Sequence, residues 1–305
     1  MSFQSLLNSR YSVGLAQGLG RAVPRSFGYW LADAGGGWIS GLRQTGIVRT
    51  VETNQRVIGG PALRQDELKR RVRATFQNTG RCLYDFYSRV GRPEAILAVM
   101  SYSEEFERCW ERVHSVRPGE PGSLLVVPHL SNFELAGQIM ALRGARPLLL
   151  STPQPKGGYR RQNQLRSQSG LETAPASIEA LRRATRTIEA GGIVITGVDR
   201  PAPGGKYHPN FFNRPSDLPV SHVRLALKLG IPVTPVACRT LPDGTYQIIA
   251  AEPIPMQPDA DLAAALVRNT ETILGVIESW IRQAPEQWSM FYPVWPDELR
   301  EKQGE

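Results

Sequence analysis

His129 and the residues around it are the part of this sequence best suited to chemistry. The short apolar run Leu124–Val127 predicts a buried strand, and Pro128 and His129 follow it directly. Glu134 comes five residues after the histidine, in what we predict to be the first turn of a helix. A histidine at the carboxyl end of a strand, with a carboxylate within reach, is a common arrangement for a general base.

The sequence offers this histidine no convincing protein nucleophile. The chain contains no G-x-S-x-G nucleophile elbow, and Ser131 fits better as part of a turn or a helix cap. The imidazole is therefore best suited to deprotonating a hydroxyl group of a substrate, which then attacks an acyl donor directly. An acid must orient the imidazole, and two candidates remain open: Glu134, and Asp199 at the end of another predicted strand.

The three other histidines are weaker candidates. His114 lies in a charged stretch and is expected on the surface. His222 lies near a predicted helix start and is expected to pack or to cap. His208 lies in a loop ahead of Phe211, where it could contact a substrate.

Composition narrows the class of protein. With 305 residues, 41% of them hydrophobic, the chain is an ordinary folding sequence. The three cysteines Cys82, Cys109 and Cys238 are scattered, so we expect neither a metal site nor a disulfide framework. A reducing cytosolic setting fits this cysteine content. The net charge of +8 favours an anionic partner, although an arginine-rich genome would give the same excess. The sequence has no long basic helix and no interleaved aromatic and basic residues, so we expect no nucleic-acid partner.

The sequence predicts contact with a membrane surface rather than a span. Arg10 interrupts the N-terminus too early for a signal peptide, and no apolar stretch approaches the roughly 20 residues that cross a bilayer. Residues 1–48 predict short amphipathic helices, broken at Gly35–Gly37. These helices either cap the core or dock into a membrane interface through their apolar side chains, which are Phe27, Tyr29, Trp30, Leu31, Trp38 and Ile39.

The elements that must hold the candidate residues alternate between strand and helix from residue 124 onward. Apolar runs predict strands at 124–128, 147–150, 193–196, 232–239 and 245–251. Helical patterns lie at 132–142, 159–169, 220–229 and 261–283, and in a helix from Ser177 whose inner face would be Ile178, Leu181, Thr185 and Ile188. Helical patterns alone precede them, at 66–90, from Pro93 toward Met100, and at 103–113.

This order predicts an α/β fold with a mixed, mostly parallel central sheet and helices on both faces. A helical, membrane-facing N-terminal region at 1–115 is expected to pack on an α/β core at 116–305. We expect the two to form one continuous domain, since no long linker separates them.

Several segments occur in an order and spacing that fit a known enzyme family. The run HLSNFELAG starts at His129, Asp199 and Arg200 follow a predicted strand, Phe211 and Phe212 are paired, and Pro285–Trp288 reads P-E-Q-W. Weaker matches are Asn54, Val57, Gly59, Asn78, Gly80, Arg81, Asn163, Arg166, Gly170, Ala180, Leu181, Gly191 and Gly192. Together they resemble the bacterial acyltransferases that acylate lipid A precursors and phosphatidylinositol mannosides, with their H-x4-D/E motif, over roughly residues 50–295.

The resemblance implies an α/β acyltransferase fold, with His129 as the base and Glu134 as its partner. It implies an acyl-CoA or acyl-carrier-protein donor as co-substrate, no tightly bound cofactor, and peripheral binding to the cytoplasmic face of the bacterial inner membrane. The expected function is transfer of a fatty acyl chain onto a hydroxyl of a membrane glycolipid or lysophospholipid. A thioesterase or lipid hydrolase that uses the same base on water, and an inactive lipid-binding relative, are the alternatives.

The resemblance also suggests which residues bind substrate. Arg160, Arg161 and Arg166 would hold a donor phosphate or an anionic acceptor, unless they form the solvated face of a basic helix. Arg200 would polarise the thioester carbonyl or hold a headgroup, unless it only pairs with Asp199.

Polar and aromatic residues complete the expected binding set. Asn132 is expected to cap the helix after His129 and to contact substrate. Phe211 and Phe212 would line an acyl channel, unless Phe212 packs in the core. The chain departs from the family pattern where Ser131 and Phe133 replace the usual glycine and tryptophan, and where Asn213 replaces a glycine.

Overall fold

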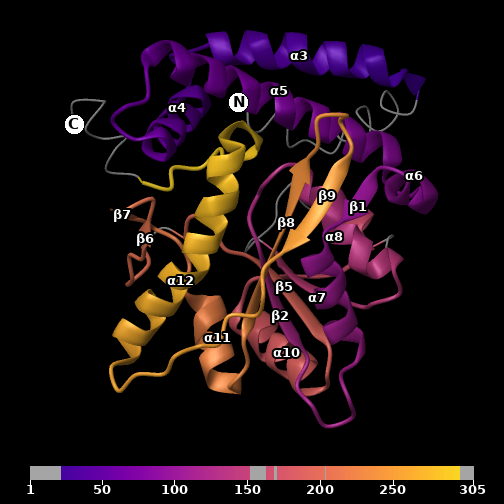
Figure 1. Cartoon of the computed structure of the whole chain (residues 1–305), viewed down its shortest axis with the longest axis vertical. Helices are drawn as coiled ribbons and strands as arrows, with labels where there is room; N and C mark the ends of the chain where they lie inside the picture. Colours follow the sequence, from indigo (N-terminus) through magenta and orange to yellow (C-terminus); the bar gives the residue numbers. More distant parts are fainter. Residues whose placement is uncertain (1–21, 152–162, 168–169, 203, 296–305) are drawn as a thin grey trace.

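A mixed seven-stranded sheet forms the centre of the computed structural model, which describes residues 22–151, 163–167, 170–202 and 204–295 (Figure 1). The strands are β1 (Met100–Tyr102), β2 (Ser123–Val127), β3 (Leu148–Ser151), β4 (Glu172–Pro175), β5 (Ile193–Gly197), β8 (Val233–Thr240) and β9 (Tyr246–Ala250). Their spatial order is β1-β9-β8-β2-β5-β3-β4, and a separate hairpin joins β6 (Asn210–Phe211) to β7 (Arg214–Pro215).

The strand directions confirm the predicted sheet. The five neighbours from β8 to β4 run parallel, β9 pairs antiparallel with β8, and β1 pairs parallel with β9. The turn between β8 and β9 lies where the sequence predicts it, and Asp243 Oδ1 accepts the backbone N–H of Thr245 at 2.8 Å across it. The sheet is therefore mixed but mostly parallel.

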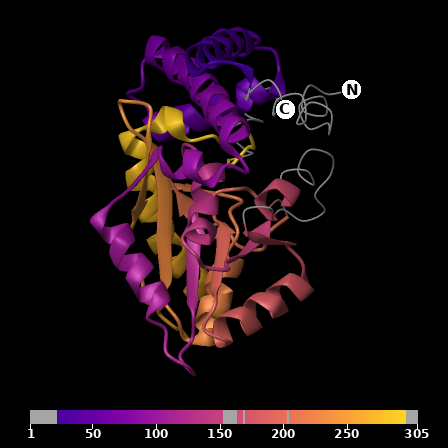
Figure 2. The same ribbon diagram turned by 90° about the vertical axis from the view of Figure 1, so that its right-hand side faces the viewer.

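Side chains of the central strand β2 alternate between two hydrophobic cores, as its geometry requires. Leu124 and Val126 enter the core covered by α10 (Ile178–Glu189), α11 (Ser221–Leu229) and α12 (Leu262–Gln283). Leu125 enters the core covered by α7 (Glu104–His114) and α8 (Phe133–Leu142). In the turned view of Figure 2, α7 and α10 lie on opposite sides of the sheet.

A layer of helices lies across the end of the sheet where the parallel strands finish, at the top of Figure 1. It consists of α3 (Arg25–Gly41), α4 (Gly46–Gly59) and α5 (Gln65–Arg89), and the short α6 (Pro93–Leu97) follows. Val48, Val51, Leu68, Val72 and Phe76 form a small core of their own between α4 and α5. Among the described residues, no helix is both long enough and apolar enough to cross a membrane.

The prediction of a helix break at Gly35–Gly37 was wrong, because α3 runs through these residues without interruption. Gly36, together with Gly28 earlier in the helix, instead allows α3 to approach α5 closely. A Cβ atom on Gly36 would lie 2.7 Å from the backbone nitrogen of Gln77, and one on Gly28 would overlap the ring of Tyr84. Glycine is costly inside a helix, but here the missing side chain is what permits the helix contact.

The inner face predicted for the helix at 178–189 was right at Ile188 but wrong at Ile178 and Leu181. Ala180, Ala184 and Ile188 are buried, whereas Ile178 is 73% exposed and Leu181 is 37% exposed. The small side chains of Ala180 and Ala184 let the helix lie close to the sheet. Counting large apolar residues along the helix did not predict this.

The sequence did not predict four of the short strands, which are β1, β4, β6 and β7. β1 and β4 lie at the two edges of the sheet, and β6 and β7 form a two-residue hairpin. All have two to four residues, too few for alternation to show. As a consequence, β1 places a strand within the region that was predicted to be entirely helical.

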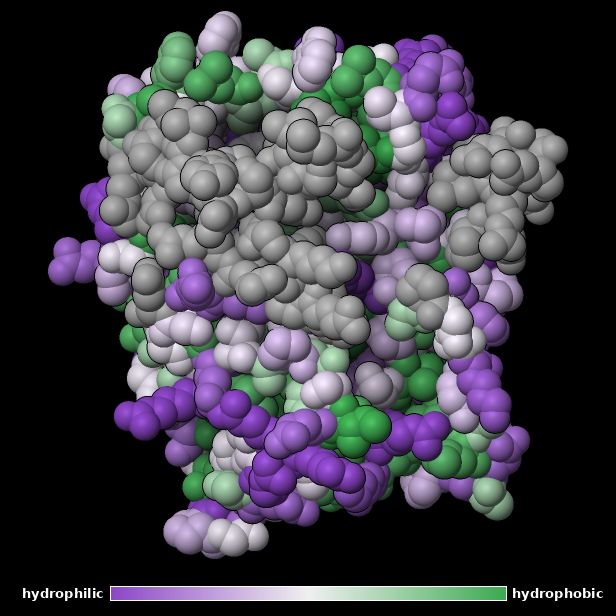
Figure 3. All heavy atoms as spheres, turned by 180° about the vertical axis from the view of Figure 1, so that it is seen from behind, coloured by the Kyte–Doolittle hydropathy of each residue, from purple (hydrophilic) through white to green (hydrophobic). Residues whose placement is uncertain are grey.

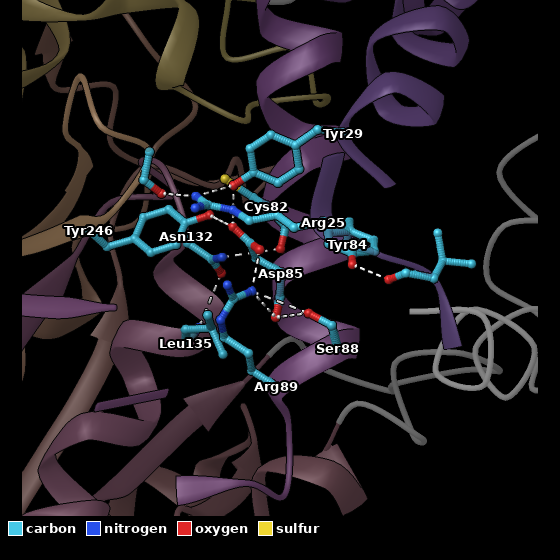
Figure 4. Close-up of polar contacts among 12 residues, drawn as sticks. Arg25, Tyr29, Cys82, Tyr84, Asp85, Ser88, Arg89, Asn132, Leu135 and Tyr246 are labelled. Atoms are coloured by element: carbon cyan, nitrogen blue, oxygen red, sulfur yellow. Dashed lines mark hydrogen bonds and ion pairs between the residues drawn. The ribbon is translucent and has the colours of Figure 1, made fainter. Parts of the chain in front are cut away.

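A buried carboxylate joins α3 to the rest of the molecule (Figure 4). Asp85 on α5 is fully buried, accepts the hydroxyls of Tyr29 at 2.6 Å and Tyr246 at 2.5 Å, and pairs with Arg89. Burial, and then the hydrogen bond and charge of Asp85, raise the pKa of Tyr29. Arg25 on α3 donates to the carbonyl of Gly244 at 2.7 Å. The network therefore fixes α3 to α5 and to the β8–β9 hairpin.

Candidate active site

The parallel pairing of β2 with β5 brings His129 and Asp199 together. The register pairs Val127 with Gly197, so His129 and Asp199 each follow two residues later. Nδ1 of His129 lies 2.7 Å from Oδ1 of Asp199, and the backbone N–H of His129 donates to Oδ2 at 2.8 Å. Of the two candidate acids, Asp199 is thus the one in contact with the imidazole.

Three N–H groups surround the carboxylate of Asp199, which is fully buried. Besides the ring and backbone of His129, the indole Nε1–H of Trp288 donates to Oδ2 at 2.7 Å. Burial by itself would raise the pKa of Asp199, but the charge of His129 and these hydrogen bonds outweigh it and hold the pKa below its usual value. Asp199 is therefore ionised at neutral pH.

The contact with Asp199 fixes the tautomer of His129. An ionised carboxylate accepts a proton at Nδ1, so the lone pair of the neutral ring lies on Nε2. The side chain of His129 is 23% exposed whereas that of Asp199 is 0% exposed, so the accessible part of the ring lies away from the carboxylate. Phe133 packs edge-on against the imidazole, with 4.7 Å between ring centroids. The arrangement suits a general base that acts through Nε2.

Glu134, which the family resemblance makes the partner of the base, forms an ion pair with Arg166. Its Oε1 and Oε2 accept from two nitrogens of Arg166, at 2.6 Å and 3.0 Å, and Arg166 also donates to Asn163 at 2.8 Å. The side chains of Glu134 and Arg166 are only 11% and 12% exposed. The physical reason is that α8 begins at Phe133, and its first turn places Glu134 against the helical residues 163–167.

This pairing also bears on Arg166, which we expected to bind an anion. Its guanidinium already holds the carboxylate of Glu134 in a two-point contact, the strong geometry for arginine. Arg160 and Arg161 lie outside the described residues. Arg200 lies against Tyr292: it donates to the phenol oxygen at 2.5 Å, and its Cζ is 4.1 Å from the ring centroid.

Asn132 is a structural residue of the turn. It is 1% exposed, and its Oδ1 accepts the backbone N–H of Leu135 at 3.3 Å, which caps α8 as predicted. Its Nδ2 donates to the carbonyl of Cys82 on α5 at 3.1 Å. Both ends of the amide are engaged, so the structure gives it a place in the support of the turn and not on an open binding surface.

The conformation of Ser131 explains why glycine is usual at this position. Its φ of 51° lies in the left-handed region, which favours glycine. Its Oγ is 2.7 Å from Oγ1 of Thr240, and the residue is 2% exposed. The hydroxyl is thus part of the turn, as the sequence predicts, and not a nucleophile. Asn213, the other replacement for glycine, also has a positive φ, of 58°.

The closing P-E-Q-W segment pairs with the turn that follows β2, which carries His129. Leu130 and Trp288 form an isolated antiparallel bridge, and the backbone N–H of Ser289 donates to the carbonyl of His129 at 2.9 Å. The side-chain amide of Gln287 makes two hydrogen bonds with the backbone of Thr240, at 2.8 Å and 3.1 Å. The segment therefore joins the end of β8 to the turn after β2.

Three side chains from α4 and α5 hold this segment from the other side. Asn54 donates to the carbonyls of Met290 and Tyr292, at 3.1 Å and 3.0 Å. Gln55 donates to the carbonyl of Pro285 at 2.7 Å, and Asn78 to that of Glu286 at 3.3 Å. The weakly matching Asn54 and Asn78 thus have a physical role in supporting the segment that contacts His129.

Phe211 and Phe212 lie in an aromatic cluster. Phe211 is 0% exposed and Phe212 is 6% exposed. Phe211 stacks on Trp295 with 5.6 Å between ring centroids and meets Trp288 edge-on at 5.9 Å. The structure shows core packing for both rings, which the sequence offered as an alternative only for Phe212.

The other histidines lie where the sequence places them. His114 is exposed. His208 is half exposed, and its Nδ1 is 3.1 Å from Asp217. His222 is 3% exposed and packed. Within the described residues, no group of three or more His, Cys, Asp or Glu side chains is placed to hold a metal ion.

Sequence reasoning gave no role to Trp288 or Gln287. The only signal for them was the P-E-Q-W run, which carries no chemistry by itself. Their contacts depend on a segment more than 150 residues from His129 in the chain returning to the turn.

The chain matches known proteins over most of its length. Residues 10–296 match the model of the family described as bacterial lipid A biosynthesis acyltransferase. Over 188 residues, the chain is 25% identical to a phosphatidylinositol mannoside acyltransferase of Mycobacterium tuberculosis (strain ATCC 25618 / H37Rv). That match covers 59% of this chain and 56% of the mycobacterial protein, little more than half its length.

Proposed function

This chain belongs to the bacterial lipid A biosynthesis acyltransferase family, and on that basis we propose that it moves a fatty acyl chain from acyl-CoA or an acyl carrier protein onto a hydroxyl group of a membrane glycolipid or lysophospholipid. The observation that supports this most is the buried, ionised Asp199 on Nδ1 of His129, which leaves Nε2 as the base. The name of the mycobacterial relative favours a glycolipid acceptor.

In the proposed reaction, His129 moves one proton. Nε2 takes the proton of the acceptor hydroxyl while the oxygen attacks the thioester carbonyl. Asp199 remains ionised and stabilises the imidazolium that forms. The tetrahedral intermediate then expels the thiolate, the C–S bond breaks, and the imidazolium returns the proton to the sulfur. The products are the new ester and the free thiol.

A direct transfer fits the surroundings of His129 better than an acyl-enzyme. The nearest hydroxyl along the chain, that of Ser131, is buried and bonded to Thr240. Arg200 lies one residue beyond Asp199, and in this proposal its positive charge polarises the thioester carbonyl or holds an anionic headgroup. Neither role needs a covalent bond to the protein.

The test combines variants with product analysis. We expect His129→Ala to abolish ester formation, and Asp199→Asn to lower kcat by at least about 100-fold, while circular dichroism shows that both variants fold. Transfer at the wild-type rate by folded His129→Ala would disprove the assignment of the base. Incubation with acyl-CoA, with and without lipid acceptor, distinguishes the reactions: equal release of free fatty acid in both would indicate hydrolysis, and binding without turnover would indicate an inactive relative.

We also propose that α3 is the surface that lies on the anionic cytoplasmic leaflet of the bacterial inner membrane. Phe27, Trp30, Leu31 and Trp38 recur at helical spacing on one side of α3 and are 48 to 64% exposed. Figure 3 shows hydrophobic side chains along the upper edge of the molecule, where α3 lies. Aromatic side chains favour the headgroup region of a bilayer, and the net charge of +8 favours anionic lipid.

Vesicle sedimentation tests this surface. Trp30→Ser with Trp38→Ser should weaken binding to anionic vesicles by at least about tenfold, because each change removes a large interfacial side chain. Leu262→Ser is the matched control: Leu262 is 48% exposed but begins α12 at the far end of the molecule (Figure 1). Equal binding by both variants would exclude α3 as the docking surface.

A further inference from the structure

Trp288 donates its indole N–H to Asp199, yet it takes no part in the proposed proton transfer. Resting on the proposed function, we propose that Trp288 is a positioning residue for acyl transfer: its indole N–H fixes Asp199 so that Oδ1 stays on Nδ1 of His129. It acts through Asp199 and touches neither substrate nor the reacting nitrogen.

The two oxygens of the Asp199 carboxylate accept different sets of hydrogen bonds. Among the described residues, Oδ1 receives the ring Nδ1–H of His129 alone, whereas Oδ2 receives two donors, the backbone N–H of His129 and the indole of Trp288. Neither a backbone N–H nor an indole N–H can accept a hydrogen bond. A proton on Oδ2 would therefore lack an acceptor, so any proton shared by the pair must lie between Oδ1 and Nδ1.

The two donors also prevent rotation of the carboxylate. If Asp199 turned about its Cβ–Cγ bond, Oδ2 would lose both hydrogen bonds inside a fully buried site. Unsatisfied charged groups in such a site are costly. The indole therefore adds a third donor to the two from His129, and together they hold the carboxylate in one orientation.

Trp288 is itself held firmly enough to do this. It is 1% exposed, and its backbone forms the bridge to Leu130 in the turn that carries His129. Its ring lies against Phe211 and Trp295, with centroids 5.9 Å and 6.2 Å away. Since the same segment binds the turn and the acid, Trp288 moves with His129 and Asp199 as one unit.

The charged surroundings leave His129 as the main partner of Asp199. His129 is the charged group that acts most strongly on this carboxylate. Arg200, next in the chain, lies over the ring of Tyr292. Removing the indole donor therefore changes the His129–Asp199 pair directly.

The test is the pH dependence of kcat/KM for Trp288→Phe with acyl-CoA and a lipid acceptor. Donors to the ionised carboxylate lower the apparent pKa of the pair, so losing one should raise the acid limb of the profile by about one pH unit. At acid pH this shift lowers kcat/KM about tenfold relative to the wild type, and the difference should shrink at alkaline pH. Site-specific replacement of Trp288 by benzothienylalanine, which keeps the ring shape but lacks the N–H, should shift the limb in the same way if phenylalanine disturbs folding.

Trp295→Phe provides the matched control. It removes an indole from the same aromatic cluster, but its Nε1 donates at 3.2 Å to the backbone carbonyl of Phe211 and not to Asp199. The acid limb of kcat/KM for Trp295→Phe should lie at the same pH as that of the wild type.

The outcomes separate this inference from the proposed function. A raised limb for both Trp288 variants, and not for Trp295→Phe, supports the inference. An unshifted limb, or a loss of the same size at every pH, overturns it, because a merely structural role would not move the profile. If folded His129→Ala still transfers at the wild-type rate, the proposed base itself fails, whatever the tryptophan variants show.

Discussion

His222 should make this protein sensitive to mild acid. The side chain is 3% exposed, and within the described part of the chain neither ring nitrogen has a hydrogen-bond partner. Burial lowers the pKa of His222 from 6.5 to about 4. The folded protein therefore keeps this ring neutral at a pH where the unfolded chain protonates it.

The sign and size of the effect follow from this difference. Between pH 6.5 and about 4 the unfolded state binds one more proton than the folded state, so stability falls as the pH falls. The contribution of His222 is fully present above pH 6.5. Lowering the pH from 7.5 to 5 should cost about 2 kcal/mol from this residue, or about a 30-fold change in the folding equilibrium.

Urea unfolding, followed by tryptophan fluorescence at pH 7.5 and pH 5, measures this loss. His222→Phe removes the titrating group, so its loss on acidification should be smaller than that of the wild type by about 2 kcal/mol. At pH 7.5 the free energy of unfolding of His222→Phe should lie within about 1 kcal/mol of the wild-type value or above it, because the change removes two buried nitrogens that lack hydrogen bonds. His114→Gln, a change at an exposed histidine, should behave like the wild type. Equal losses in wild type and His222→Phe would refute the reasoning.

Four further substitutions test the packing and the ion pairs. Gly36→Val should lower stability by about 2 kcal/mol because its Cβ meets backbone of α5 at 2.7 Å, whereas Gly35→Ala, with nothing within 4 Å, should raise it by up to about 1 kcal/mol; thermal unfolding compares the two. Asp85→Ala should cost about 3 to 5 kcal/mol in urea, since it leaves a buried cation unpaired, and near-wild-type stability would contradict its role as the anchor of α3. Glu134→Gln should lower stability by about 1 to 3 kcal/mol through its pair with Arg166, yet leave the acid limb of kcat/KM in place; a shifted limb would restore Glu134 as a partner of the base.

Much of the fold could be predicted because long elements repeat their pattern many times. The strand at 193–197 and the helix at 262–283 lie within a residue or so of the sequence prediction. Short elements such as β1 and β4 carry too few residues for alternation to appear. The glycines at 35–37 misled because glycine lowers helix propensity locally, whereas the contact with α5 that requires Gly36 is set by another part of the chain.

Part of the candidate site could likewise be predicted from local sequence, and part could not. The type and place of His129 were visible in the sequence, since a histidine directly after a buried apolar run must emerge at the end of a strand. Which carboxylate meets it was not visible. Glu134 is five residues away in the chain, yet the first turn of α8 carries it to Arg166.

The sequence by itself determined the alternation of strands and helices, the place of His129 at a strand end, and the presence of two acids that could serve it. Only the tertiary structure decided between them. β5 lies beside β2 with Val127 paired to Gly197, so Asp199 arrives next to His129 from 70 residues away. Trp288 then returns from 89 residues beyond Asp199 to donate to it. Local patterns reflect the chain's own periodicity, whereas a hydrogen bond between strand ends depends on strand order and register, which only the packed sheet sets.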